Sequence, residues 1–160
     1  MKEFLQIIKY KLTWLNVFLI VITVILSLYY YKIAAITFVL LSNLYDILGY
    51  HFTLVRRTTQ LPEKIIIRAY RINQLLFDFL LLVLIGMSFD WIAALAGWMM
   101  KNFGLQDLFY YIFLQMKLPE KWTWMKWTPL GFFKGDLSKN EIILQTIIGV
   151  VISLVILLLR

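Results

Sequence analysis

Residues 12–52 read LTWLNVFLIVITVILSLYYY-K-IAAITFVLLSNLYDILGYHF, two apolar runs separated by a single lysine. A helix of about 20 apolar residues crosses the ~30 Å hydrocarbon core of a bilayer. The first run carries no charge, and Lys32 leaves almost no room for a loop between the two runs. This stretch therefore predicts two membrane-spanning helices, 12–31 and 33–52, joined as a tight hairpin.

Two further apolar runs follow the hairpin. The third, 72–89, is interrupted only by Asp78, and the fourth, 142–159, is followed by Arg160. Together the four runs predict an all-α integral membrane protein, a four-transmembrane-helix bundle that forms one membrane domain over 1–160. The basic and apolar residues of 2–9 add a short amphipathic N-terminus, which we expect on the inner membrane surface.

The composition excludes a soluble protein. Of the 160 residues, 62% are hydrophobic and 16% are charged, and the mean hydropathy is +0.80. A single core of this size cannot bury so much apolar surface, so the surplus must face lipid. The net charge of +7 fits Lys and Arg that flank membrane spans, and nucleic acid is not an expected partner. The absence of cysteine excludes disulfides, thiolate metal sites and cysteine nucleophiles.

Basic residues between the spans predict the orientation. The connection between the second and third spans is strongly basic, which places it inside by the positive-inside rule. Four spans then put both termini inside, in what we expect to be a bacterial cytoplasmic (inner) membrane, and leave 101–141 outside. Four residues of the connection should also attract anionic lipid headgroups, by about 1 kcal/mol per charge: Arg56, Arg57, Lys64 and Arg68.

The segment 90–140 is predicted to form a Trp-rich interfacial cap between the third and fourth spans. Asp90 can cap a helix over 91–101, and a second amphipathic piece follows at 105–116. Five of the six tryptophans fall between Trp91 and Trp127. Because tryptophan concentrates at the level of the lipid headgroups, we expect this segment to lie along the outer membrane surface.

Polar residues on two consecutive spans predict a cluster near the inner leaflet. Each set has the i, i+3, i+7 spacing of one helix face: Asn43, Asp46 and Tyr50 on the second span, and Arg71, Gln74 and Asp78 on the third. By helical rise, both carboxylates lie about 8–9 Å inside the membrane boundary. A charge within a span costs about 2.5–3.5 kcal/mol and indicates either a function or a paired charge.

Three interpretations of this cluster stay open. In the first, Asp46 and Asp78, with His51, form a catalytic or transport site for a proton, a cation or a polar headgroup. The remaining polar residues would then bind the ligand: Asn43, Tyr50, Arg71 and Gln74. In the second, Arg71 pairs with one or both carboxylates as a structural contact. In the third, the polar faces contact another subunit.

A second pair of candidate carboxylates lies in the outer segment. Asp90 and Asp107 could form an acid–base or metal site under an aromatic lid. Alternatively, both could start helices, where acidic side chains are favoured. One histidine cannot supply a two-histidine site, and the chain carries none of the common hydrolase, metalloprotease or nucleotide-binding motifs. No metal or cofactor is predicted.

The leading hypothesis of function is a non-catalytic subunit or scaffold of a larger or oligomeric membrane assembly, with a membrane protein or a second copy as partner. Two pairs of small residues, Ala93 with Gly97 and Gly149 with Ser153, predict close helix packing and, as a second use, contacts between copies. The alternative is a membrane-embedded enzyme or carrier for a lipid-like substrate, with Asp46 and Asp78 in its site.

Overall fold

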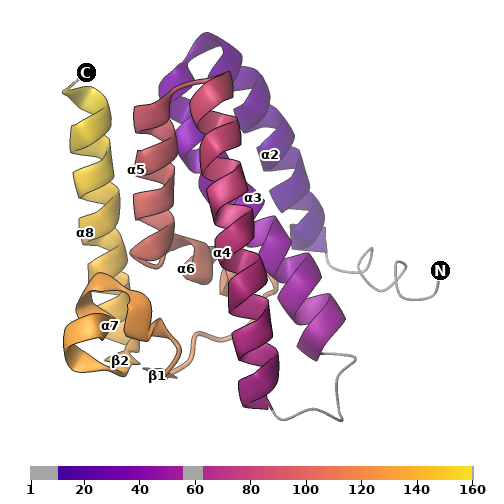
Figure 1. Ribbon diagram of the computed structural model, residues 1–160, viewed down its shortest axis with the longest axis vertical. Coiled ribbons are helices and arrows are strands. Elements are labelled where there is room, and N and C mark those ends of the chain that lie inside the picture. The colour runs from indigo at the N-terminus through magenta and orange to yellow at the C-terminus, as the bar shows by residue number, and fades with distance from the viewer. Residues whose placement is uncertain (1–10, 56–62, 160) are drawn as a thin grey trace.

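The computed structural model describes residues 11–55 and 63–159, and this part of the chain is almost wholly helical (Figure 1). In chain order the elements are α2 (Lys11–Tyr29), the 3-10 helix η1 (Tyr31–Ile33), α3 (Ala34–Asp46), the π-helix η2 (Ile47–Val55), α4 (Glu63–Ser88), α5 (Trp91–Asn102), α6 (Leu105–Phe113), β1 (Lys121–Trp122), the 3-10 helix η3 (Met125–Trp127), α7 (Pro129–Lys134), β2 (Leu137–Ser138) and α8 (Lys139–Leu158).

The predicted class of fold, an all-α bundle with four helices of membrane-spanning length, is confirmed. Within the described residues, four stretches are long and apolar enough to cross a bilayer: Leu12–Tyr29, Tyr31–His51, Ala69–Ser88 and Lys139–Leu158. The predicted amphipathic stretch 2–9 and the basic residues Arg56 and Arg57 lie outside the described residues.

Helices α2 and α3 form the tight hairpin that the sequence predicts, with η1 as the turn. Polar side chains join the two helices: Ser27 and Thr37 are 3.4 Å apart between their hydroxyl oxygens, and the Asn16 amide donates to the Leu40 carbonyl oxygen at 3.4 Å. Helix α3 lies at the centre of the bundle, where it contacts α2, α4, α5 and α6.

Helix α5 packs inside the bundle, whereas the sequence places it in a cap on the membrane surface. One face of α5 consists of small buried residues: Ala93, Ala94, Ala96 and Gly97. A Cβ atom on Gly97 would come within 2.5 Å of the Ala35 carbonyl oxygen, so only glycine allows this approach of α5 to α3. Helix α5 thereby contacts α3, α4 and α8 and carries the chain back along the bundle (Figure 1).

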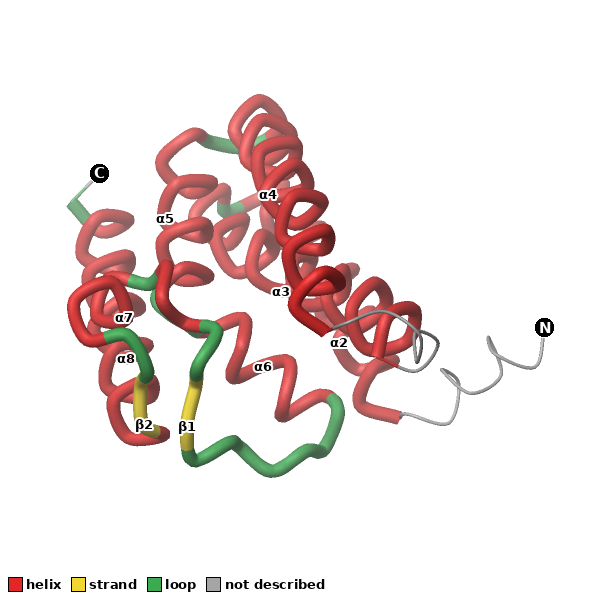
Figure 2. The backbone as a smooth tube through the Cα atoms, turned by 60° about the horizontal axis from the view of Figure 1, so that its bottom comes forward, coloured by secondary structure: helices red, strands yellow, loops and turns green. Residues whose placement is uncertain are grey.

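The remainder of the predicted cap folds at one end of the bundle. Strands β1 and β2 pair antiparallel, with Trp122 opposite Leu137. Trp122 is fully buried, in a small core that also contains Met125 and Ile142. Figure 2 shows α6, β1, β2 and α7 gathered beside the beginning of α8. We call this the lower end of the bundle; α4 also begins here, and the α2–α3 turn marks the upper end (Figure 1).

The return of α5 changes the predicted arrangement of the chain ends. Leu12, near the beginning of α2, packs with Ile47 and Leu114 at the lower end, while Leu157 of α8 belongs to the same cluster as Ala93 at the upper end. Helix α2 therefore begins, and α8 ends, at opposite ends of the bundle (Figure 1). The sequence predicts both on one side of the membrane, because a 12-residue helix is too short to be counted as a span.

Candidate functional site

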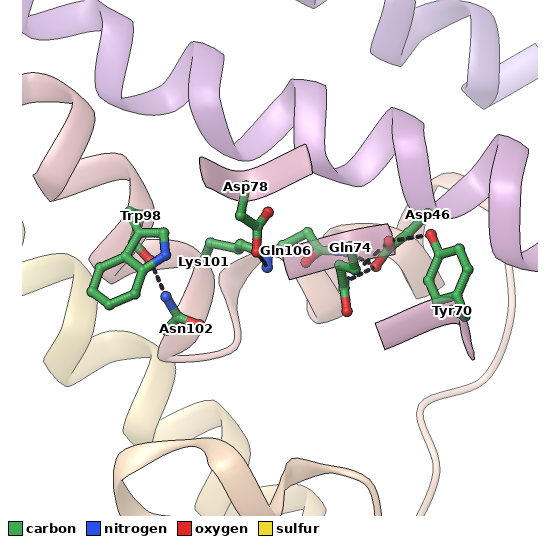
Figure 3. Close-up of polar contacts among 8 residues, drawn as sticks. All are labelled: Asp46, Tyr70, Gln74, Asp78, Trp98, Lys101, Asn102 and Gln106. Atoms are coloured by element: carbon green, nitrogen blue, oxygen red, sulfur yellow. Dashed lines mark hydrogen bonds and ion pairs between the residues drawn. The ribbon is translucent and has the colours of Figure 1, made fainter. Parts of the chain in front are cut away.

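Asp46, the last residue of α3, accepts hydrogen bonds from three side chains on two other helices. From α4, the Tyr70 hydroxyl donates at 2.5 Å and the Gln74 amide donates to both carboxylate oxygens, at 3.1 and 3.0 Å. From α6, the Gln106 amide donates to the same carboxylate. Figure 3 shows Tyr70, Gln74 and Gln106 converging on Asp46. The site thus brings together the polar faces of α3 and α4, which the sequence predicts to face each other. A third helix, α6, adds a further donor, Gln106.

Asp78 of α4 forms an ion pair with Lys101, at the carboxyl end of α5. Both residues are buried, each only 8% exposed. In Figure 3 the pair lies beside Gln106, in one row with the contacts of Asp46. The prediction that Arg71 pairs with the carboxylates is therefore wrong for Asp78, whose ion-pair partner is Lys101.

Arg71 instead joins α4 to the segment that follows β1. Its guanidinium donates to the Trp124 carbonyl oxygen at 2.8 Å. The indole nitrogen of Trp124 in turn donates to Asp107 of α6 at 3.2 Å. Trp124 therefore holds the guanidinium of Arg71 and the carboxylate of Asp107 at one place on the lower end of the bundle.

Four residues of the predicted inner cluster and one of the two predicted outer carboxylates, Asp107, line one cavity of about 390 Å³. The sequence predicts the two clusters on opposite sides of the membrane. In the structure, the return of α5 brings their residues to the same end of the bundle. The side chains that line the cavity come from α3, η2, α4, α6 and the loop after β1: Asp46, Tyr50, Tyr70, Arg71, Gln74, Asp107, Tyr110, Tyr111, Thr123 and Trp124.

A larger groove of about 930 Å³ adjoins this cavity and shares Arg71, Gln74, Asp107 and Trp124 with it. The rest of the groove is lined by apolar side chains of α4, α5 and the segment after β1, and by polar residues that include the ion-paired Asp78 and Lys101. The apolar residues from α4 are Ile72, Leu75, Phe79 and Leu82. Ile72, Leu75 and Phe79 are exposed on the outer face of the bundle. The polar cavity is therefore continuous with an exposed apolar surface of α4, a helix of membrane-spanning length.

His51 and Asn43, two further candidates, lie beside the cavity and do not line it. The Nδ1 atom of His51 is 3.2 Å from the Tyr110 hydroxyl, so the histidine contacts a residue that does line the cavity. Asn43 is fully buried, and its amide atoms have no hydrogen-bond partner within the described part of the chain.

The alternative pair of carboxylates, Asp90 and Asp107, is not formed. Asp90 caps α5, where its carboxylate accepts from the backbone N–H groups of Ile92 and Ala93 at 2.8 and 2.9 Å. Asp107 lies beyond the other end of α5, a helix of 12 residues that rises about 18 Å. Of the two interpretations, the helix start is correct for both residues: Asp90 caps α5, and Asp107 lies in the first turn of α6, where it also lines the cavity.

Burial changes the acid–base properties of the α6 side chains in the cavity. It raises the pKa of Asp107, an effect that the Trp124 hydrogen bond and the charges of Lys101 and Arg71 partly oppose. Burial, with the nearby charge of Asp107, raises the pKa of Tyr111 to about 12. The tyrosines of this helix therefore present neutral hydroxyl groups at physiological pH. Among the described residues, no group of three His, Cys, Asp or Glu side chains is placed to hold a metal ion.

The sequence does not predict the roles that three residues have in this site: Lys101, Gln106 and Tyr70. Lys101 and Gln106 fall in the segment that the sequence predicts to lie on the membrane surface, away from the spans. One signal was available for Lys101. A buried carboxylate needs a cation, and Lys101 lies in the last turn of α5, an apolar helix between the third and fourth spans.

No protein-family model matches this chain, and no curated protein or solved structure is significantly similar to it. The function proposed below is accordingly argued from the cavity and its surroundings.

Proposed function

We propose that this protein is a membrane-embedded binding protein for a lipid-like, amphipathic molecule, whose polar end enters the cavity at the lower end of the bundle. One observation carries the proposal: a cavity with two carboxylates, a guanidinium and five aromatic side chains adjoins a groove that is lined in part by exposed apolar side chains of α4, a helix of membrane-spanning length. Its volume of about 390 Å³ lies within the ~300–1,000 Å³ that is usual for ligand pockets.

The orientation that fits this proposal puts the cavity on the cytoplasmic side. Most Lys and Arg residues of the described elements belong to the lower end, whereas Lys32 lies in the turn at the upper end. The return of α5 also brings the lysines of 117–139 to the lower end, so the positive-inside rule is met better than by the arrangement expected from sequence. We therefore propose that α2 begins inside and that α8 ends outside.

The subunit or scaffold hypothesis has less support. It rests on the lack of catalytic motifs, the small soluble portion and the polar residues on the span faces, and several of those polar residues are hydrogen-bonded within the chain. The small residues that could also serve contacts between copies are used within the chain as well. Gly97 faces Ala35, a Cβ atom on Gly149 would come within 2.2 Å of Phe103, and Ser153 donates to the Ala96 carbonyl oxygen at 3.2 Å. The cavity, in contrast, has no evident structural purpose in a simple scaffold.

A catalytic version of the same function is favoured by one observation, the contact between His51 Nδ1 and the Tyr110 hydroxyl. Histidine and tyrosine are common general acid–base residues, and Tyr110 lines the cavity. In this version, His51→Gln would abolish turnover of a bound lipid while its binding persisted. Loss of binding itself would assign His51 a structural role.

Native mass spectrometry of the full chain, extracted in a mild detergent, tests the binding proposal. We expect a lipid-sized adduct on the wild-type protein. Thr123 is exposed and lines the cavity, so Thr123→Trp should fill the cavity and remove the adduct. Asn140→Trp places the same side chain on an exposed position of the same end, away from the cavity, and should keep it. Equal adducts on all three proteins would contradict the proposal.

A further inference from the structure

We propose that the cavity binds the headgroup of a zwitterionic phospholipid, with the ammonium group among the aromatic rings and carboxylates and the phosphate at Arg71. This inference rests on the proposed function and adds the chemical class of the ligand. Three parts of the site carry it: the aromatic lining, the excess of carboxylates, and the position of the guanidinium between the cavity and the groove.

The aromatic lining is suited to an ammonium group. Four tyrosines and a tryptophan line the cavity, and several of their rings are close neighbours. The ring centroids of Tyr110 and Tyr111 are 5.4 Å apart and nearly perpendicular, and those of Tyr111 and Trp124 are 6.5 Å apart. Aromatic rings that surround a cavity are the usual means of recognising quaternary ammonium ligands, because the face of each ring attracts a cation.

The carboxylates favour a cation over an anion. Within the described residues, neither Asp46 nor Asp107 has an ion-pair partner: the donors to Asp46 are a hydroxyl and two amides, and the donor to Asp107 is an indole. Lys101, the nearest buried lysine, is already paired with Asp78. A purely anionic headgroup would therefore meet two carboxylates, whereas an ammonium group would supply the charge that they lack.

Arg71 lies where the phosphate of such a lipid would be. It lines both the cavity and the groove, and in a phospholipid the phosphate joins the headgroup to the apolar part. Its hydrogen bond to the Trp124 carbonyl oxygen fixes the guanidinium, which has five N–H donors in all and binds phosphate readily. Beyond Arg71, the groove continues along Leu75 and Phe79, both exposed apolar residues of α4.

The arrangement predicts a selectivity that can be measured. Native mass spectrometry of the delipidated full chain would be run with phosphatidylcholine, phosphatidylethanolamine and phosphatidylglycerol of identical acyl chains. We expect both zwitterionic lipids to bind at least about tenfold more tightly than phosphatidylglycerol. Arg71→Gln should weaken all three lipids, because all contain the phosphate, and Asp107→Asn should reduce the selectivity. Lys126→Gln, on the exposed surface of the same end, should change neither.

The outcomes separate this inference from the proposed function. Phosphatidylglycerol bound as well as or better than the zwitterionic lipids would overturn the headgroup assignment and leave lipid binding intact. No lipid bound by the wild-type protein would overturn both. Free phosphocholine bound as tightly as phosphatidylcholine would overturn the assignment to a lipid. The comparison among lipids on the wild-type protein stands even if a variant fails to fold.

Discussion

Lys101 at the carboxyl end of α5 is ion-paired with Asp78 of α4, and both side chains are buried. The two residues are 23 positions apart in the chain. The pair joins α5 to α4 near the end of α5. Here the chain has returned from the upper end of the bundle and continues into α6. It neutralises the charge that the sequence analysis found within the third span.

The ion pair predicts non-additive mutations. Removing either partner leaves a buried charge uncompensated, so Asp78→Asn or Lys101→Met alone should lower the free energy of unfolding by about 3–5 kcal/mol. Removing both charges together should recover much of that loss, because apolar replacements of buried pairs are often neutral or stabilising. Denaturant titration of the purified protein in detergent measures all three variants. A double variant as unstable as the sum of the single ones would contradict the pairing.

The contact between Tyr70 and Asp46 predicts a smaller effect. Tyr70→Phe removes one hydroxyl donor to a carboxylate and should cost about 1.5–3 kcal/mol of unfolding free energy. Tyr45→Phe is the matched control, because the ring of Tyr45 stacks on Phe77 with centroids 4.1 Å apart, and the substitution keeps that ring. Thermal unfolding of the two variants checks this prediction; equal losses would mean that the Tyr70 hydroxyl has no special role.

The position of α5 predicts the sidedness of the chain. Reporter domains inserted at Lys121 and fused after Leu159 should report inside and outside, respectively, because β1 lies at the lower end and α8 finishes at the upper end. The four-span arrangement expected from the sequence predicts the reverse at both positions. An outside signal at Lys121 would therefore restore that arrangement and separate the two halves of the cavity.

The raised pKa of Asp107 predicts a pH dependence of ligand binding. The groups that face this carboxylate are Arg71, Lys101, Asp46, Tyr110, Tyr111 and the Trp124 indole, and burial outweighs the two cations. An ammonium headgroup needs the ionised carboxylate, so binding should weaken as the pH falls through a pKa above the ordinary value for Asp. Lipid retention measured across pH should show this loss in the wild-type protein and a flatter profile in Asp107→Asn. Stronger retention in acid would contradict it.

The raised pKa of Asp107 also predicts how the stability of the fold depends on pH. Ionisation of this carboxylate favours ligand binding but lowers the free energy of unfolding. Because the folded protein holds the Asp107 proton to a higher pH than the unfolded chain does, ionisation removes stability as the pH rises from the unfolded pKa through the folded one. Asp107→Asn should therefore unfold at a relatively higher temperature than the wild-type protein at neutral pH, with the difference shrinking in acid. If the stability of Asp107→Asn relative to the wild-type protein were lower at neutral pH than in acid, the raised pKa of Asp107 would be contradicted.

Hydropathy predicted the four long helices, because a span of about 20 apolar residues has few other uses. Helical spacing likewise predicted that Asp46 and Gln74 lie on helix faces that pack against each other, and the two side chains are hydrogen-bonded. The position of α5 could not be read in this way, since its 12 residues are short for a span and its tryptophans are typical of an interface. Because the sequence predicts α5 on the outer membrane surface, it also predicts Asp107 far from Asp46 and does not predict Lys101 as the partner of Asp78.

The central claim is that a lipid headgroup occupies the cavity. It is tested most directly by photo-crosslinking with a phospholipid that carries a diazirine beside its headgroup, followed by peptide mapping of the full chain in membranes. We predict that the adducts concentrate on Tyr110, Tyr111 and Trp124, which line the cavity, and that Thr123→Trp removes them. Adducts confined to the outer faces of α2 and α8, unchanged in that variant, would contradict the account.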